Sequence, residues 1–126
     1  MAMTAPDNLR YTPDHEWVRL EGDLATIGIT DHAQQELSDI VFVELPDMGT
    51  FDKGAACAVV ESVKAASDIY TPVAGEIVEI NLDLVADPSK VNSSPYEGGW
   101  IFKMKVANVS DVEALMDSSS YVSIVR

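Results

Sequence analysis

The sequence predicts a mainly β fold, a small barrel or sandwich of short strands with two or three short helices. Two observations lead to this prediction. Short runs of β-branched and aromatic residues recur along the chain, and turns containing Gly or Pro separate them. Helical spacing of apolar residues is confined to a few short segments, whereas a parallel sheet would need a crossover helix between successive strands.

The first expected elements are a hairpin and a helix. Residues 17–20 and 24–29 favour strands, and the Gly-containing tripeptide between them has the composition of a hairpin turn. Thr30 can then cap a short helix, since an acidic residue and an apolar i, i+4 pair follow it. We expect this helix to end before the β-branched run at residues 40–45, which predicts a core strand.

The middle of the chain predicts three further strands and a long loop. Residues 55–61 and 68–73 favour strands, and Lys64 falls at the bend between them. Residues 75–81 alternate polar and apolar side chains, which predicts a strand with one face in water. Residues 83–99 are rich in Asp, Pro, Ser, Asn and Gly, so we expect an extended surface loop there.

The C-terminal part predicts one strand and one helix. Residues 100–106 have β character, and both tryptophans of the chain are expected in or near the core. Ser110 and Glu113 have the spacing of a capping box, and the apolar residues within 112–116 have helical spacing. A packing helix should therefore close the fold.

Length and composition favour one domain. The 126 residues, of which 47% are hydrophobic, suffice for a core, so we expect one domain over residues 1–126 with extensions around a core hairpin at residues 55–81. No apolar run approaches the roughly 20 residues that cross a bilayer, and the first ten residues lack a signal core. The expected location is the cytoplasm of a bacterium, or the mitochondrial matrix for a processed eukaryotic form.

Charge narrows the classes of partner. The chain has 21 acidic and 8 basic residues and a formal net charge of −13, which repels nucleic acid and anionic membranes. We therefore expect neither as a partner, whereas basic patches on other proteins would attract the chain. The one cysteine and two histidines, which lie far apart in sequence, are a poor ligand set for zinc, so we expect no metal.

The bend at Lys64 is the strongest candidate for function. A lysine at a hairpin tip extends its amine on a flexible stem toward other proteins, and small residues beside it leave room for a modifying enzyme. By spacing alone, such a lysine is more often only a solvated charge. The string around it reads ESVKAASD over residues 61–68.

This string resembles the lipoylation motif of the glycine cleavage system H-protein family, and the resemblance extends over almost the whole chain. Four further blocks carry it: YTPDHEWV at residues 11–18, TIGITDHAQ at 26–34, VFVELP at 41–46, and NSSPY at 92–96 followed by Gly99 and Trp100. Several blocks in the same order make chance similarity a poor explanation.

The resemblance implies both a fold and a function. The fold would be the lipoyl-type barrel-sandwich hybrid, two small sheets with short flanking helices, one of them at the C-terminus. Lys64 would carry lipoate in amide linkage. The chain would be a carrier and not an enzyme, bringing the aminomethyl group of glycine from a PLP-dependent glycine decarboxylase to a tetrahydrofolate-dependent aminomethyltransferase, with dihydrolipoyl dehydrogenase restoring the disulfide.

The same resemblance implies roles for other side chains. Glu61 would be read by the lipoyl-attaching enzyme, and Glu16 and His32 would lie beside the loaded arm and shelter the aminomethyl group. Plainer alternatives stay open: a surface charge for Glu16, an ordinary first-turn helix residue for His32 and a solvated strand end for Glu61. Ser67 and Asp68 are expected to shape the turn by local hydrogen bonds.

Other functions have less support. A related lipoyl carrier in another pathway, such as sulfur oxidation or lipoate relay, would use the same lysine. A biotin carrier would have methionines on both sides of the lysine, where this chain has Val63 and Ala65. A thiol enzyme would need His15 or His32 beside Cys57, but a cysteine in an apolar strand is more often inert.

Overall fold

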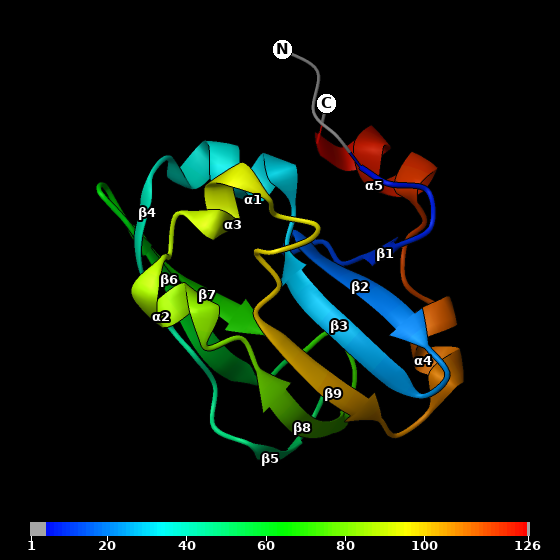
Figure 1. Ribbon diagram of the computed structural model, residues 1–126. Coiled ribbons are helices and arrows are strands. Elements are labelled where there is room, and N and C mark those ends of the chain that lie inside the picture. The colour runs from blue at the N-terminus through cyan, green and yellow to red at the C-terminus, as the bar shows by residue number, and fades with distance from the viewer. Residues whose placement is uncertain (1–4, 126) are drawn as a thin grey trace.

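A computed structural model describes residues 5–125 of the chain and shows two antiparallel sheets that pack face to face (Figure 1). The larger sheet has the strand order β1-β2-β3-β9-β8-β5, and the smaller has the order β4-β6-β7. The strands are β1 (Arg10–Tyr11), β2 (Glu16–Glu21), β3 (Leu24–Ile29), β4 (Ile40–Glu44), β5 (Gly49–Phe51), β6 (Ala56–Ser62), β7 (Ala66–Tyr70), β8 (Gly75–Ile80) and β9 (Phe102–Val106). The helices are α1 (Asp31–Leu37), α2 (Asp83–Ala86), α3 (Lys90–Ser93), α4 (Val109–Glu113) and α5 (Ser118–Val125).

The first hairpin and helix form as the sequence predicts. Strands β2 and β3 pair in antiparallel register around a turn in which Gly22 has φ +66°, a conformation that glycine adopts at little cost. The Thr30 hydroxyl accepts a hydrogen bond from the Ala33 amide at 3.2 Å and so caps α1. The helix ends before β4, also as expected.

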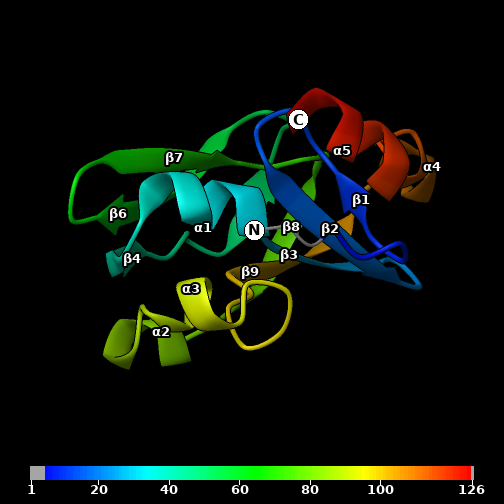
Figure 2. The same ribbon diagram turned by 90° about the horizontal axis from the view of Figure 1, so that it is seen from above.

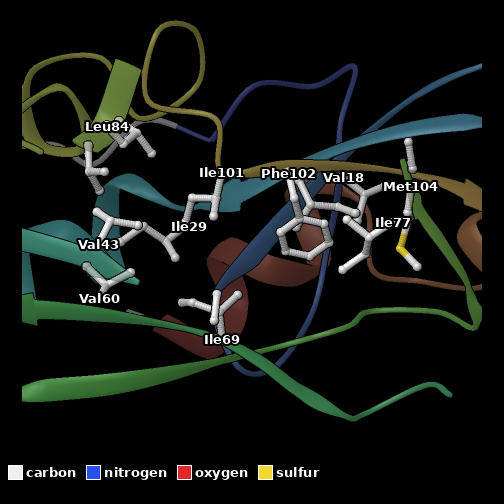
Figure 3. Packing of buried hydrophobic residues seen from close by; sticks show 14 of the residues in the cluster. Val18, Ile29, Val43, Val60, Ile69, Ile77, Leu84, Ile101, Phe102 and Met104 are labelled. Carbon is white, nitrogen blue, oxygen red and sulfur yellow. The ribbon is translucent and has the colours of Figure 1, made fainter. Parts of the chain in front are cut away.

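The main core lies between the two sheets. Buried aliphatic and aromatic side chains from both sheets point toward one another there (Figure 3). The labelled members are Val18, Ile29, Val43, Val60, Ile69, Ile77, Leu84, Ile101, Phe102 and Met104. Because neither sheet could bury these residues alone, the two sheets are stable only together.

A second apolar cluster joins the two ends of the chain. The rings of Tyr11 on β1 and Tyr121 on α5 stack with their centroids 4.7 Å apart, and both side chains are buried with Leu9 and Trp17. Figure 1 shows α5 beside β1 at the edge of the larger sheet. The terminal helix is therefore held by contacts with the first strand.

The segment 83–99 is not the extended loop that we expected. It contains the short helices α2 and α3, and their residues Leu84 and Val91 belong to the main core. Helices of four residues are too short to show apolar periodicity, so the polar composition of the segment dominated the prediction.

The expected C-terminal capping box is also wrong. Asn108 caps α4 by accepting a hydrogen bond from the Ser110 amide at 3.1 Å, so Ser110 lies inside the helix. Met116 lies beyond that helix and pairs with Tyr11 in an isolated β-bridge. The helix predicted near the C-terminus is present as α4, and a second helix, α5, follows it.

Strand β4 is an edge strand and not the expected core strand. Ile40 and Val43 are buried, but Val41 and Phe42 are exposed. Both tryptophans lie where predicted, with Trp17 buried and Trp100 half-buried. Within residues 5–125, no helix is long and apolar enough to cross a membrane.

Substitution of Gly28 by Ala should destabilise the fold by about 2 kcal/mol, because overpacking in a rigid core displaces its neighbours. A Cβ atom at Gly28 would lie 2.7 Å from Nε1 of the buried Trp17 side chain. Urea denaturation monitored by tryptophan fluorescence measures the change. Gly98→Ala is the matched control, because its Cβ would meet its nearest neighbours at 3.9 Å, and equal effects of the two substitutions would contradict the prediction.

Candidate functional site

Lys64 lies in the turn of the β6–β7 hairpin, as the sequence predicts. The hydroxyl of Ser62 holds this turn by accepting hydrogen bonds from the amides of Lys64 at 3.2 Å and Ala65 at 3.1 Å. The Ser62 amide also donates to the Ala65 carbonyl at 2.7 Å. The Lys64 side chain is exposed, and these hydrogen bonds fix the backbone that carries it.

Ser67 and Asp68 do not shape this turn, contrary to expectation. Both belong to β7, where they pair with Val60 and Val59 of the neighbouring strand. The side chain that ties the turn is Ser62, on the other side of the lysine.

The hairpin extends the turn away from the larger sheet. Figures 1 and 2 show the turn between β6 and β7 at the outer end of the molecule. The Val63 amide donates to the Asp39 carbonyl at 3.1 Å, which links the turn to the chain just before β4. Lys64 is thus presented at a protruding end and not in a cleft.

Glu16 is the first residue of β2 and contacts the end of β7 that lies away from the turn. It is only 1% exposed, so it is not a surface charge. Thr12 Oγ1 donates to Glu16 Oε1 at 2.9 Å, and the Tyr70 amide donates to Oε2 at 2.9 Å. Burial raises the pKa of Glu16 to about 7 despite these two hydrogen bonds. The carboxyl group is therefore poised between its two protonation states near neutral pH.

A pocket of about 120 Å³ opens beside Glu16. Thr12, Tyr70 and Lys53 are among the residues that line it. Tyr70 ends strand β7, whose five residues span roughly 14 Å from the turn that contains Lys64. Lys64 therefore lies in the turn of the β6–β7 hairpin, and the pocket lies at the other end of the same hairpin.

His32 lies in the first turn of α1 beside a second histidine. The rings of His15 and His32 are 4.7 Å apart between centroids, and His32 Nε2 lies 3.4 Å from Glu36 Oε1. Burial, and secondarily the charge of His32, lower the pKa of His15. His15 Nδ1 is 2.8 Å from the Tyr121 hydroxyl, so this pair is tied to α5.

No local sequence pattern indicated that Tyr121 joins this group. The Tyr121 hydroxyl lies 2.7 Å from Thr30 Oγ1 and 2.8 Å from His15 Nδ1. Both of these residues are about a hundred positions from Tyr121 in the sequence. Local periodicity carries no information on such distant contacts, and only a covarying set of sequences would reveal them.

Cys57 has the environment of an inert core residue. Its side chain is half-buried, and Sγ lies 3.5 Å from the Ile69 carbonyl oxygen. Burial raises the pKa of the thiol to about 12, so the nucleophilic thiolate is scarce at neutral pH. Within the described part of the chain, no group of three or more His, Cys, Asp and Glu side chains is placed to hold a metal ion.

Comparison with known proteins decides the family. The family model described as Glycine cleavage H-protein matches residues 9–126. The chain belongs to the glycine cleavage H-protein family. The expected resemblance is thereby confirmed over nearly the whole sequence.

Similar proteins agree with this assignment. The chain is 53% identical to the glycine cleavage system H protein of Methylacidiphilum infernorum, with 98% of each chain covered. It is 54% identical to the H protein of Escherichia coli, covering 96% of this chain and 95% of that protein. A crystal structure of the H protein from Mycobacterium marinum superposes with a TM-score of 0.86 at 37% identity, covering 95% of this chain and 98% of that one.

The assignment confirms the predicted fold and role. The two sheets with short helices are the lipoyl-type barrel-sandwich hybrid of this family. As a family member, the chain is the lipoyl shuttle of the glycine cleavage system, a carrier component and not a catalytic enzyme. A lipoyl carrier of another pathway is not favoured.

The titration of Glu16 should make stability depend on pH. An unfolded chain releases the Glu16 proton near pH 4.5 and the folded chain near pH 7, so the free energy of unfolding should fall as pH rises between these values. The expected loss is about 3 kcal/mol. Glu16→Gln lacks this titration, so its stability relative to wild type should rise by that amount across the same range.

Urea denaturation of both proteins between about pH 4.5 and pH 8 measures this difference, with the exposed Glu113→Gln as control. The control should follow the wild-type profile. Parallel profiles for wild type and Glu16→Gln would show that the carboxyl group titrates normally.

Proposed function

We propose that the chain shuttles the aminomethyl group of glycine on lipoate attached to Lys64. The observation that carries this proposal is the exposed primary amine in a turn tied by Ser62, within the string that resembles the lipoylation motif. The residues around the amine fit the group, since Ala65 and Ala66 leave the side chain open to a modifying enzyme. When bound, lipoate supplies a disulfide that can accept both a carbon group and electrons.

The partners follow from the cycle of the family. They are the PLP-dependent glycine decarboxylase, the aminomethyltransferase, dihydrolipoyl dehydrogenase and the lipoyl-attaching enzymes. Tethering keeps the cargo at an effective concentration that can reach the millimolar range near each enzyme. We propose one carrier domain over residues 1–126, and the bacterial relatives support a cytoplasmic location.

Glu61 is proposed as a recognition residue for the lipoyl-attaching enzyme. It is exposed in β6 and pairs with Ala66 across the hairpin, next to the turn that presents the lysine. A carboxylate at this position can accept hydrogen bonds from an enzyme that binds the turn.

Glu16 and His32 are proposed to shelter the aminomethyl group. Glu16 lines the pocket at the base of the hairpin, and its carboxylate can hold the cationic amine of the cargo. The proposal for His32 rests on the family resemblance and on its half-buried place on α1 beside His15. The ring nitrogens of an imidazole there can form hydrogen bonds with the cargo.

Lys64→Arg should abolish lipoylation, because a guanidinium keeps its charge and forms no amide with lipoate under these conditions. Intact-mass spectrometry after incubation with a lipoate ligase measures the mass of one lipoyl group on wild type. Lys105→Arg is the control, because this lysine is exposed on β9 in the other sheet. A lipoylated Lys64→Arg protein, or its full turnover of glycine, would exclude the proposed attachment site.

Glu16→Gln should release the aminomethyl group about tenfold faster, because a charge-assisted hydrogen bond is worth about 1.5–3 kcal/mol. A single-turnover assay that follows release from the loaded carrier measures the rate. Glu113→Gln again serves as control. If the carrier with Gln at position 16 kept its cargo as long as wild type, the sheltering role of the carboxylate would be lost.

A further inference from the structure

The chain from Thr12 to Glu16 forms a tight loop that is closed by its own hydrogen bonds. The Thr12 amide donates to the Glu16 carbonyl at 3.0 Å, and the His15 amide donates to the Thr12 carbonyl at 3.1 Å. His15 has φ +69°, a left-handed conformation that permits this sharp reversal of the chain. Thr12 and Glu16 are 5% and 1% exposed, so the loop holds their side chains together in a buried place.

The Thr12 hydroxyl group makes two hydrogen bonds to Glu16, and the direction of each is fixed. The Glu16 amide can only donate, so the Thr12 oxygen accepts from it at 3.2 Å. The hydroxyl proton is therefore directed to Glu16 Oε1, 2.9 Å away. The backbone amide of Tyr70 donates to Oε2. Of these two donors to the carboxyl group, only the Thr12 hydroxyl belongs to a side chain, so only this donor can be removed by substitution.

These donors favour the charged form of Glu16. Hydrogen bonds to a carboxylate stabilise it, whereas a proton on the same oxygens competes with the donors. They act against burial, which raises the pKa of Glu16 to about 7. Without the Thr12 hydroxyl group, burial would be opposed by one hydrogen bond fewer, and most of the carboxyl groups would be neutral at pH 7.

The amine of the cargo requires the charged form. Glu16 lines the pocket of about 120 Å³ in which we propose that the aminomethyl group is sheltered. A carboxylate holds a cationic amine by a charge-assisted hydrogen bond, and a neutral carboxyl group holds it less well. A carboxylate has about four lone-pair positions. Thr12 and the Tyr70 amide use two of them, so positions remain for the amine.

We propose that Thr12 is a positioning residue of the carrier, whose hydroxyl group orients the Glu16 carboxylate and keeps it charged for the amine of the cargo. This inference rests on the proposed function of Glu16 and Lys64. Thr12 acts through Glu16 and needs no contact with the cargo. Loss of its hydroxyl group should therefore make the carrier release the cargo at a pH at which wild type retains it.

Other titratable groups near the Glu16 carboxyl group come from the elements packed around it. Asp14 lies in the same loop, and its charge adds to the effect of burial on the pKa of Glu16. Lys53, before β6, and Tyr70, at the end of β7, line the pocket. Burial, and secondarily the charge of Glu16, raise the pKa of the Cys57 thiol on β6 to about 12, so it stays neutral near pH 7. All four groups are the same in every variant compared below.

Carbon-13 NMR of the side-chain carboxyl groups in the unloaded carrier measures the midpoint of the Glu16 titration. We expect a midpoint near pH 7 in wild type. In Thr12→Val it should lie about one to two pH units higher, because a hydrogen bond to a charged group is lost. Thr12→Ser keeps the hydroxyl group and should restore the wild-type midpoint. Thr50→Val is the matched control, because it makes the same change at an exposed position on β5.

The single-turnover release assay is then run on the loaded carriers as a function of pH, with Glu16→Gln as the background. Release should become faster as pH falls and Glu16 takes up a proton. The cationic amine stabilises the carboxylate, so the midpoints of the loaded carriers should lie below those of the unloaded ones. The midpoint for Thr12→Val should still exceed that of wild type by about one to two pH units, and Thr12→Ser should match wild type.

Three results would contradict this role of Thr12 or its basis. A wild-type midpoint in unloaded Thr12→Val would overturn the proposal. Release that is faster by one factor at every pH would also overturn it, because a merely structural role predicts that result. A shifted midpoint in the unloaded carrier, beside wild-type release that ignores pH, would instead refute the sheltering role of Glu16 on which the inference rests. If circular dichroism showed Thr12→Val to be unfolded, Thr12→Ala would serve in the same comparison, because it removes the hydroxyl group and adds no methyl group in its place.

Discussion

The burial of one face of the β6–β7 hairpin is the constraint on which the rest of the molecule depends. Val60 and Ile69 are fixed in the core between the sheets, so the pleat of each strand directs the alternate side chains to solvent. The same register places Lys64 beyond the last pair and leaves it free. A slip by one residue would exchange the buried and exposed faces and would expose the core.

Glu16 on β2 links the larger sheet to the end of the β6–β7 hairpin, and its burial makes the charged form of the carboxyl group less stable. The carboxyl group receives hydrogen bonds from Thr12 and from the Tyr70 amide, so it joins the loop before β2 to the end of β7. Burial nevertheless opposes its ionisation. This cost, together with the place of Glu16 in the wall of a pocket, is the basis for the role that we propose for it.

Local chemistry was sufficient for the elements that have strong signals. The Thr30 cap, the Gly22 turn and the bend at Lys64 were predicted because each depends on a few adjacent residues. The short helices at residues 83–93 were not predicted, and the local pattern did not place the last helix at α5. Their stability comes from Leu84, Val91 and Tyr121 packing on distant strands, which local propensity does not record.

By itself, the sequence determined the class of fold, the position of the presented lysine and the family, because these depend on local patterns and ordered motifs. Only the tertiary structure decided that Glu16 is buried, that His15 meets His32 and Tyr121, and that Phe42 faces solvent beside carboxylates. Those facts depend on which strands pair and in which register. Register is set by the burial of the whole core, and no single segment contains that information.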